Sequence, residues 1–289
     1  MQRLIVKTSA AAAVVLGLLV VSAAAVAPVR HVASGWWNSP DRLAALPDFP
    51  QVHYEEGAAD RARIVAELLP AAIARVEAAH GRPFAHPATI GVYRTPEAFA
   101  AANGTGFSGA VGVNFLGRVI LSPALFTTKR TRLPAILTHE LSHAHIRSWM
   151  SELRFIALPN WFKEGLAVSV SGGGGAEEVS VADARDAIRW GDQIAVRDAG
   201  SLFDWVGIRM ERPPQVRDTS FRIQLAYRQA GMFVAFLQDT NPVAFATMMR
   251  AILDGRPFAE AVATGYHTDV EELWLRFVRS SARSAGPTE

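Results

Sequence analysis

The sequence predicts an α+β fold in which an N-terminal lobe with a mixed sheet and helices is followed by a helical C-terminal lobe. Two patterns predict this division: short apolar runs of strand length lie before residue 122, and segments with apolar residues at helical spacing follow it. Hydrophobic residues make up 50% of the 289 positions, which is enough for one sizeable core or for two lobes that share a cleft. We therefore assign residues 51–278 to one domain, with lobes at 51–150 and 151–278.

The composition excludes several kinds of site and partner. The chain has no cysteine, so it can form neither a disulfide framework nor a thiolate metal site, and any metal must be held by His, Asp or Glu. The formal net charge of +2 is spread along the chain without long basic runs, so the sequence predicts no nucleic-acid partner. No sequence feature indicates an oligomeric state.

Residues 1–29 are predicted to be a targeting segment, either a cleaved signal peptide or an N-terminal membrane anchor formed by a hydrophobic helix. Arg3 and Lys7 precede an uncharged apolar run of 22 residues, 8–29, and the small residues at 23–27 could serve as a peptidase site. At about 1.5 Å per residue, a helix of that length also reaches across a bilayer core of about 30 Å. The positive residues before the run place the domain outside the cytoplasm, on the periplasmic or extracellular side, anchored or secreted.

The segments that flank the domain show no helical or strand periodicity. Residues 30–50 are rich in Pro, Ser and Trp, and we predict a linker there, either a free tether or a strap packed on the surface through Trp36 and Trp37. Residues 279–289 are predicted to be a disordered tail.

The first part of the domain alternates helices with short strands. A helix is expected at 58–79, where Pro70 should bend or divide it, and a strand is expected at 89–93. Thr95 followed by Pro96 is typical of a helix N-cap with proline at the first helical position.

A strand pair ends the predicted sheet, and helices follow it. Residues 107–121 predict two strands joined by a turn near Gly117, and the glycines of the first strand favour an edge position. A helix is expected at 132–149, and another should begin after Pro159 and end before a flexible run of glycines at 172–175. Helical character recurs further along the chain, at 181–190, 220–238, 243–253, 258–263 and 270–280.

An HExxH pattern lies within the helix predicted at 132–149. His139 and His143 are four residues apart, so they project from one face one turn apart, and both imidazoles can reach one ion. Glu140 lies about 100° further round the helix, where it can act on a water at the metal without being a ligand. His145 points away from this face and is predicted to be a surface or packing histidine.

A catalytic zinc site needs a third protein ligand, and Glu164 is the best candidate. A third histidine shortly after the motif, as in metzincins, is missing from residues 147–155. Gly165 beside Glu164 would let two helices approach closely, and the apolar neighbours would bury its carboxylate, which then needs a partner such as a metal ion. The alternative is a solvated glutamate at a helix start, favoured by the helix dipole.

Five segments of the chain carry a family resemblance: GRVILSP, HELSHAHI, LPNWFKEGLA, AYRQAGMFVAFL and GRPFAEAVATGYHTDVEELW. Over residues 51–278 they resemble the peptidase MA-like family of bacterial gluzincins, which are distant relatives of thermolysin and the M1 aminopeptidases. The resemblance implies a zincin-like fold of two lobes and one Zn²⁺. By resemblance, the site consists of the zinc ligands His139, His143 and Glu164, the catalytic Glu140, and Tyr227 near the active site.

The chain departs from these relatives at two points. Thermolysin-type enzymes carry an aspartate four residues after the ligand glutamate, where it orients a zinc histidine, and this chain has Val168 at that position. The Gly-x-Met-Glu-Asn segment of the M1 aminopeptidases is also missing from the sequence. The sequence therefore disfavours aminopeptidase activity and leaves the partners of the zinc histidines unassigned.

Together these features predict a zinc-dependent endopeptidase that hydrolyses an extended polypeptide. Zinc would activate a water and polarise the scissile carbonyl, and Glu140 would act as the general base. Tyr227 is either a hydroxyl donor to the oxyanion or a core aromatic residue. A strand at 119–121 is expected to pair with the substrate backbone.

Three alternatives stay open. The same zinc chemistry could hydrolyse a non-peptide amide of the cell envelope. The chain could instead be a non-catalytic, membrane-tethered interaction protein in which the motif helix merely packs. It could also be a zinc protein held inactive by a lid, with the glycine run at 172–175 as the hinge.

Overall fold

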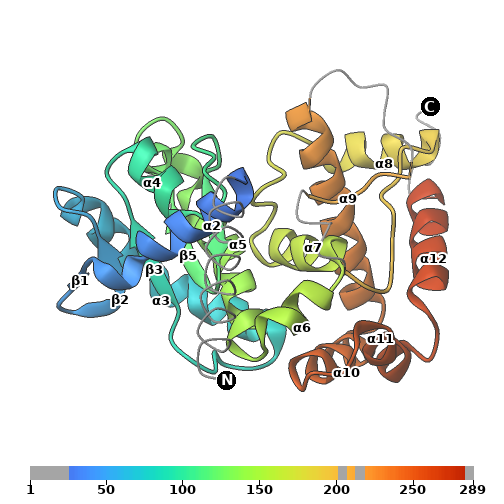
Figure 1. The fold of residues 1–289 in the computed structure, drawn as a ribbon. Helices are drawn as coiled ribbons and strands as arrows, with labels where there is room; N and C mark the ends of the chain where they lie inside the picture. The colour runs from blue at the N-terminus through green and yellow to red at the C-terminus, as the bar shows by residue number, and fades with distance from the viewer. Residues whose placement is uncertain (1–25, 201–206, 212–218, 284–289) are drawn as a thin grey trace, which may run out of the picture.

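The computed structural model describes residues 26–200, 207–211 and 219–283. A five-stranded mixed sheet with its helices forms the N-terminal part, and a mainly helical C-terminal part lies beside it (Figure 1). The named strands of the described chain all lie before residue 122, so the predicted α+β class is confirmed.

The sheet has parallel strands at its centre and antiparallel strands at its edges. Its strands are β1 (Ala44–Leu46), β2 (Phe49–Tyr54), β3 (Thr89–Val92), β4 (Gly112–Phe115) and β5 (Arg118–Leu121), in the spatial order β1-β2-β3-β5-β4. Because parallel neighbours need a crossover, α3 (Ala59–His80) connects β2 to β3. Leu116 and Gly117, both with positive φ, form the tight turn between β4 and β5. The glycine-bearing strand β4 is an edge strand, as predicted.

Two helices of the N-terminal part bear on the sequence predictions. α3 runs unbroken for 22 residues, so Pro70 does not divide it, which was one of the two predicted effects. Pro70 is exposed, and buried residues such as Val65 and Leu69 hold the helix against the core in spite of the lost backbone hydrogen bond. α4 (Pro96–Ala102) begins as predicted, because the Thr95 side chain accepts a hydrogen bond from the Ala98 N–H at 3.2 Å.

One helix, α5 (Leu133–Ser148), lies between the sheet and the C-terminal helices. It contacts α3, β4 and β5 as well as α7 (Asn160–Val170), and twelve of its sixteen residues are buried. A helix buried nearly all round must satisfy its ionisable side chains inside the protein. The motif residues of α5 therefore need partners from the neighbouring elements.

The C-terminal part is held together by close helix packing. α7 packs along α9 (Thr219–Thr240), and a Cβ added at Gly165 would lie 2.6 Å from the carbonyl oxygen of Ala230. Gly165 thus allows a close approach to α9. The remaining helices are α6 (Glu152–Ala157), which was not predicted, α8 (Val181–Trp190), α10 (Pro242–Leu253), α11 (Phe258–Tyr266) and α12 (Val270–Arg283).

The segment predicted to be a linker at 30–50 is folded, and the tether prediction is wrong. It contains most of α2 (Ala27–Trp37), a 3₁₀ turn at Pro40–Arg42, β1 and the start of β2. The Ser34 hydroxyl donates to the carbonyl of Ala101 at 2.9 Å, and so the segment packs as a strap. However, the strap does not pack through its tryptophans, because Trp36 and Trp37 are 61% and 68% exposed. Its contacts include the close approach of Gly35 to Gly104 and an ion pair between Asp41 and Arg118, which a composition rich in Pro, Ser and Trp does not reveal.

Both chain ends bear on the remaining predictions. Residues 1–25 of the targeting segment predicted at 1–29 lie outside the described residues. Residues 284–289 of the predicted tail also lie outside them. Residues 279–283 continue α12, so the disordered tail does not begin at 279. Within the described chain, none of the helices combines the length and the hydropathy that crossing a bilayer requires.

We expect Gly165→Ala to lower the free energy of unfolding by about 1–3 kcal/mol, although alanine is the better helix former. The added methyl would press on the backbone of α9, which cannot yield as the end of a side chain can. Chemical denaturation of the metal-free protein measures the change. Glu260→Ala, at an exposed site of α11, is the control and should stay within about 0.5 kcal/mol of wild type. Equal stability of both variants would show that α7 and α9 are not in close contact.

Candidate metal centre

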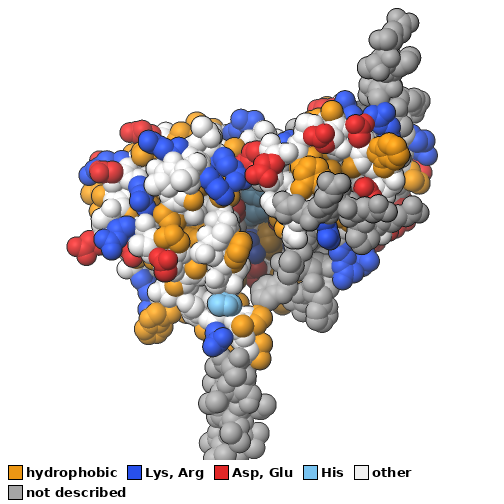
Figure 2. Space-filling model, turned by 90° about the horizontal axis from the view of Figure 1, so that it is seen from above, with side chains coloured by type: hydrophobic (Ala, Val, Ile, Leu, Met, Phe, Trp, Pro, Cys, Tyr) orange, Lys and Arg blue, Asp and Glu red, His pale blue; other side chains and the backbone are white. Residues whose placement is uncertain are grey.

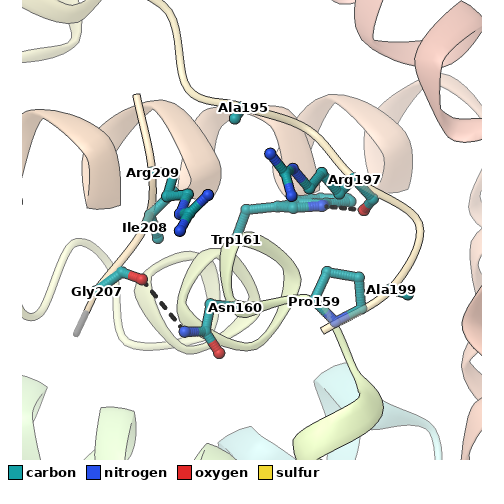
Figure 3. Close-up of a pocket in the computed structure, with 9 residues that line it drawn as sticks. All are labelled: Pro159, Asn160, Trp161, Ala195, Arg197, Ala199, Gly207, Ile208 and Arg209. Atoms are coloured by element: carbon teal, nitrogen blue, oxygen red, sulfur yellow. Dashed lines mark hydrogen bonds between the residues drawn. The ribbon is translucent and has the colours of Figure 1, made fainter. Parts of the chain in front are cut away.

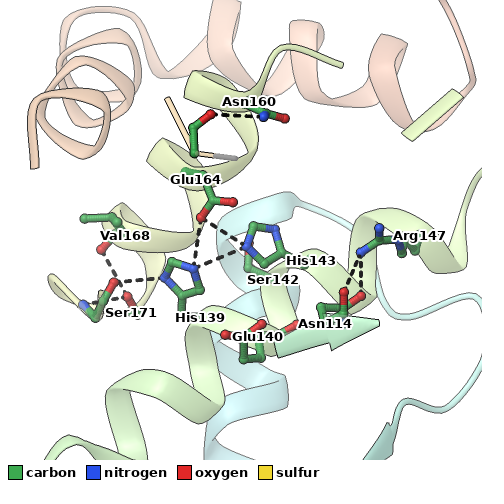
Figure 4. Close-up of polar contacts among 12 residues, drawn as sticks. Asn114, His139, Glu140, Ser142, His143, Arg147, Asn160, Glu164, Val168 and Ser171 are labelled. Atoms are coloured by element: carbon green, nitrogen blue, oxygen red, sulfur yellow. Dashed lines mark hydrogen bonds and ion pairs between the residues drawn. The ribbon is translucent and has the colours of Figure 1, made fainter. Parts of the chain in front are cut away.

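Three side chains that the sequence selects as metal ligands meet between α5 and α7. His139 and His143 come from adjacent turns of α5, and Glu164 comes from the second turn of α7 (Figure 4). Nε2 of His139 lies 3.2 Å from Nε2 of His143 and 3.3 Å from Oε2 of Glu164. The same Glu164 oxygen lies 3.4 Å from Nε2 of His143. These are the described residues whose ligand atoms converge closely enough to hold one metal ion.

The spacing of the three atoms fits a tetrahedral ion. Bonds of about 2.0–2.1 Å at tetrahedral angles place neighbouring ligand atoms about 3.3–3.4 Å apart. The observed separations of 3.2, 3.3 and 3.4 Å match this value. Two imidazoles and one carboxylate are also a ligand set found in catalytic zinc sites, where a fourth position stays available for water or substrate. The residues present therefore fit one Zn²⁺.

The hydrogen on the His139 ring shows why the cluster needs a cation. Nδ1 of His139 lies 2.9 Å from the carbonyl oxygen of Gly174, which can only accept, so Nδ1 carries the hydrogen. In the neutral ring, Nε2 then presents a lone pair to the carboxylate of Glu164 at 3.3 Å. Two facing lone pairs repel unless a positive charge lies between them. That charge is either a metal ion or a second proton on the ring.

The glycine run at 172–175 folds against α5 and supplies this acceptor. Three of its four glycines have positive φ, which turns the chain so that the Gly174 carbonyl faces His139. The Gly174 N–H donates to the Ser171 hydroxyl at 2.9 Å, and this hydroxyl in turn donates to the Val168 carbonyl at 3.2 Å. The side chain of Val168, the position at which thermolysin-type enzymes carry an orienting aspartate, packs against Gly231. A backbone carbonyl thus does the orienting, and the expectation of a merely flexible loop missed it.

Glu140 is buried beside the ligands without joining them. Its carboxylate lies against Gly112 of β4, where an added Cβ would be 2.9 Å from Oε1 of Glu140. The Asn114 amide donates to the backbone carbonyl of Glu140 at 3.2 Å, and Arg147 donates to the amide oxygen of Asn114 at 2.6 Å. The edge strand and α5 are therefore attached to each other at the residue that the sequence selects as the general base.

The electrostatic environment differs between the two carboxylates. Burial raises the pKa of Glu140, and although His139 and His143 act in the opposite direction, the net change is upward. For Glu164, burial alone would raise the pKa, but His143 and His139, when each ring carries its second proton, lower it well below its usual range. Glu164 is thus ionised and suited to bind a cation, whereas Glu140 is suited to exchange a proton.

Tyr227, from α9, reaches the same cluster. Its ring stacks on that of His139, with centroids 6.3 Å apart and planes 9° apart. Burial, together with the charges of Glu164 and Glu140, raises the pKa of Tyr227 well above its usual range, so the hydroxyl keeps its proton and is available as a donor. The structure places this residue beside the ligands and not in a purely apolar contact.

The second histidine is supported by packing. The ring of Phe155, from α6, stands edge-on to His143 with centroids 6.4 Å apart. Arg147 and Lys163 lie over the Phe155 ring, 3.7 and 4.7 Å from its centre. Among the described residues, no hydrogen-bond partner reaches the buried Nδ1 of His143. Its orientation is therefore set by its neighbours' shape.

His145 was predicted to be either a surface or a packing histidine, and the structure shows that it is a packing histidine. It lies fully buried, with Nε2 2.8 Å from the Arg82 carbonyl and Nδ1 2.8 Å from Nδ1 of His80, whose Nε2 lies 3.1 Å from the Ser142 hydroxyl. Because the carbonyl can only accept, the hydrogens follow one order: Ser142 donates to His80, His80 to His145, and His145 to Arg82. This neutral network joins α5 to α3.

The cluster lies at the junction of the two parts of the molecule. Figure 2 shows a hollow between them, with histidine and acidic side chains visible in its depth. A small pocket lies at the start of α7, one turn before Glu164, and is lined by Asn160, Trp161 and residues of the loop after α8 (Figure 3). The Asn160 amide donates to the Gly207 carbonyl at 3.2 Å, and the Trp161 indole donates to the Arg197 carbonyl at 2.8 Å. These bonds attach the loop to the helix that carries Glu164.

Comparisons with known proteins assign no family to this arrangement. Searches of protein-family models, of curated proteins and of solved structures found no match to the chain. The interpretation of the site therefore depends on its own residues and geometry, and the resemblance to the peptidase MA-like family stays a prediction.

The strand predicted to pair with substrate at 119–121 is wrongly placed. These residues belong to β5, which lies between β3 and β4 and already pairs on both sides. β4 is the strand at this edge of the sheet, and the order of strands cannot be read from local pattern. Gly174, Phe155 and Asn114 were also missed, because each acts through a contact distant in sequence.

An ion pair attaches the segment after the glycine run to the start of α5. Arg132 Nε and Nη2 donate to the two carboxylate oxygens of Glu177 at 3.0 and 2.8 Å. Burial alone would raise the pKa of Glu177, but the hydrogen bonds and the charge of Arg132 outweigh it and lower the pKa. The pair therefore stabilises the glycine run only while Glu177 is ionised.

We expect Glu177→Gln to lower the free energy of unfolding at neutral pH, and we expect this difference from wild type to shrink in acid. A carboxylate whose pKa is lowered by folding stabilises the protein above its unfolded pKa of about 4.3, and this stability is lost as pH falls through the lower folded pKa. Denaturation of both proteins between about pH 7 and about pH 3 measures the difference. The exposed Glu260→Gln is the control. A Glu177→Gln effect that is unchanged in acid would contradict the assigned ion pair.

Proposed function

We propose that this protein is a zinc-dependent endopeptidase of the gluzincin type, with His139, His143 and Glu164 holding one Zn²⁺. The observation that supports it best is the triangle of ligand atoms, whose spacing matches tetrahedral zinc. The hydrogen bond to Gly174 directs a His139 lone pair into this triangle. In this proposal the two parts of the molecule are the lobes of a zincin-like fold, and the domain lies outside the cytoplasm.

The donor atoms favour zinc over other common cations. Mg²⁺ and Ca²⁺ prefer sets of oxygen ligands in larger coordination shells, whereas two imidazole nitrogens and one carboxylate oxygen at tetrahedral spacing suit Zn²⁺. When bound, Zn²⁺ supplies the Lewis acidity that activates water and polarises a scissile carbonyl.

Glu140 moves the proton in the proposed reaction. Its carboxylate takes a proton from the attacking water and later delivers it to the leaving nitrogen, so that the C–N bond breaks and the products are a carboxylic acid and an amine. Burial raises the pKa of Glu140 toward the pH at which both transfers occur. The Gly112 position leaves room for this carboxylate against β4.

The free edge of β4 supports an extended polypeptide as substrate. β4 pairs with β5 on one side, and none of the strands in the described chain pairs with its other side. Gly112 contacts the Glu140 carboxylate, so a peptide added along this edge would pass the general base and the ligand cluster. Pairing through the backbone recognises a stretch of chain without its ends, which favours internal cleavage.

Tyr227 is the proposed second donor of the site. Its raised pKa keeps the hydroxyl protonated, and its ring stacks on that of His139. In the reaction this hydroxyl can donate to the developing oxyanion of the substrate.

Purified protein should contain close to one zinc ion per chain, and His143→Ala should lose most of it because a ligand nitrogen is removed. Elemental analysis after dialysis against a weak chelator measures the zinc content. His86→Ala removes an exposed histidine and is the matched control, which should keep the metal. Full retention of zinc by folded His143→Ala protein would end the ligand assignment.

Glu140→Gln should keep the zinc and lose about 10²–10⁴-fold in peptide cleavage, because an amide cannot accept the proton. Digestion of an unbiased peptide library, followed by mass spectrometry, measures the loss and shows whether the cleaved bonds are internal. The exposed Glu260→Gln should cleave as wild type does. Equal cleavage by Glu140→Gln would reject Glu140 as the base. Zinc-loaded wild type that cleaves no peptide would instead favour the envelope-amide hydrolase.

A further inference from the structure

Helix α2 packs against the protein with its polar face and exposes its apolar face, the opposite of an ordinary surface helix. The face that it turns toward the N-terminal part carries small and polar residues, including His31, Ser34 and Gly35. Ser34 donates to the carbonyl of Ala101, and Gly35 lies so close to Gly104 that an added Cβ would be 2.8 Å from its backbone. A surface helix normally buries its apolar stripe and exposes its polar face.

The opposite face of α2 is apolar along its whole length. At about 100° per residue, Val29, Ala33, Trp36 and Val26 lie opposite the face that carries His31, Ser34 and Gly35, with Val32 and Trp37 at the borders. All six are exposed. Five of the twelve exposed large hydrophobic residues of the described chain fall within these twelve positions, 26–37. Scattered exposed apolar residues need no explanation, but a continuous stripe of them indicates an interaction surface.

The sequence that leads into α2 indicates what covers this stripe. Residues 8–25, ahead of the proposed docking face, carry no charge over 18 positions, and at about 1.5 Å per residue a helix of that length would reach about 27 Å, close to the hydrocarbon core of about 30 Å. α2 begins at Ala27, so no spacer separates the apolar run from the helix. A bilayer that accepts the run therefore has its surface at the start of α2.

The chemistry around the stripe also matches a lipid surface. α2 carries Arg30 and no acidic residue, and the guanidinium of Arg42 lies 4.5 Å from the centre of the Trp37 ring. Tryptophan is enriched at the interface between hydrocarbon and headgroups, and basic residues beside it favour anionic headgroups. Both the apolar and the charged parts of this surface thus point to the same occupant.

We propose that the outward face of α2, formed by Val26, Val29, Val32, Ala33, Trp36 and Trp37, lies on the lipid bilayer and docks the domain against it. This goes beyond the proposed peptidase function and does not depend on zinc. Through Gly35, α2 also contacts Phe115, the last residue of β4. Docking would therefore set the orientation of the β4 edge with respect to the membrane.

The experiment uses the full-length chain in vesicles of phosphatidylcholine and phosphatidylglycerol. Because the chain has no cysteine, Ala33→Cys places a single environment-sensitive fluorophore on the outward face. Trp190→Cys places the same label in the C-terminal part, at a residue that is 84% exposed. We expect the label at position 33 to show a blue-shifted emission that lipids spin-labelled on their acyl chains quench, and the label at position 190 to report water.

A second variant tests whether the face itself makes the contact. In the Ala33→Cys background, Trp36→Ser with Trp37→Ser should remove the blue shift and the quenching, whereas Trp190→Ser should change neither. A label at position 33 that reports water in the wild-type face would overturn the proposal. Lipid quenching that survives the double substitution would also overturn the proposal, since the contact with lipid would then come from the apolar segment before α2 alone. A label shielded from water but not quenched by lipid would indicate a second copy of the chain instead.

Discussion

The hydrogen bond from Nδ1 of His139 to the carbonyl of Gly174 is the interaction on which the site depends. A carbonyl accepts and never donates, so it decides which ring nitrogen carries the hydrogen and which presents a lone pair. That lone pair faces a carboxylate and a second imidazole, so the cluster requires a positive charge among them, either a metal ion or a second proton on the ring. His139 and His143 are buried, so desolvation adds to the cost of leaving these groups without a compensating charge.

The two histidines are held by different physical means, and the difference affects the charge of the site. A carboxylate in place of the Gly174 carbonyl would orient His139 equally well but would add a negative charge. Among the described residues, the negative charge that shifts the pKa values of this cluster comes from Glu164 and Glu140, and their own pKa values shift in opposite directions. His143, in contrast, is held by the ring of Phe155, which packs against it edge-on. No polar group in the described part of the chain bonds to its Nδ1. The site thus combines one carboxylate whose pKa is lowered, Glu164, with one carboxyl whose pKa is raised, Glu140.

The edge strand β4 connects the site to the outer surface of the protein. Its first residue, Gly112, contacts the Glu140 carboxylate, and its last residue, Phe115, contacts α2. Asn114 between them is bonded to α5 and to Arg147. A strand fixed at both ends keeps one position with respect to the base, which is what a substrate-pairing edge requires. A membrane-docked α2 would extend the same constraint to the orientation of the whole domain.

Much of the site was determined by sequence alone, because its spacing is local. The separation of His139 and His143 by one helical turn follows from backbone geometry whatever surrounds the helix, and the N-cap at Thr95 and the edge character of a glycine-bearing strand are similarly local. Tertiary structure decided the rest. Glu164 reaches the histidines because α7 packs on α5, and the Gly174 carbonyl reaches His139 across 35 positions of chain. Contacts between segments far apart in sequence likewise decide the order of β4 and β5 and the folding of residues 30–50 onto the sheet-bearing part. No periodicity within a segment encodes such contacts.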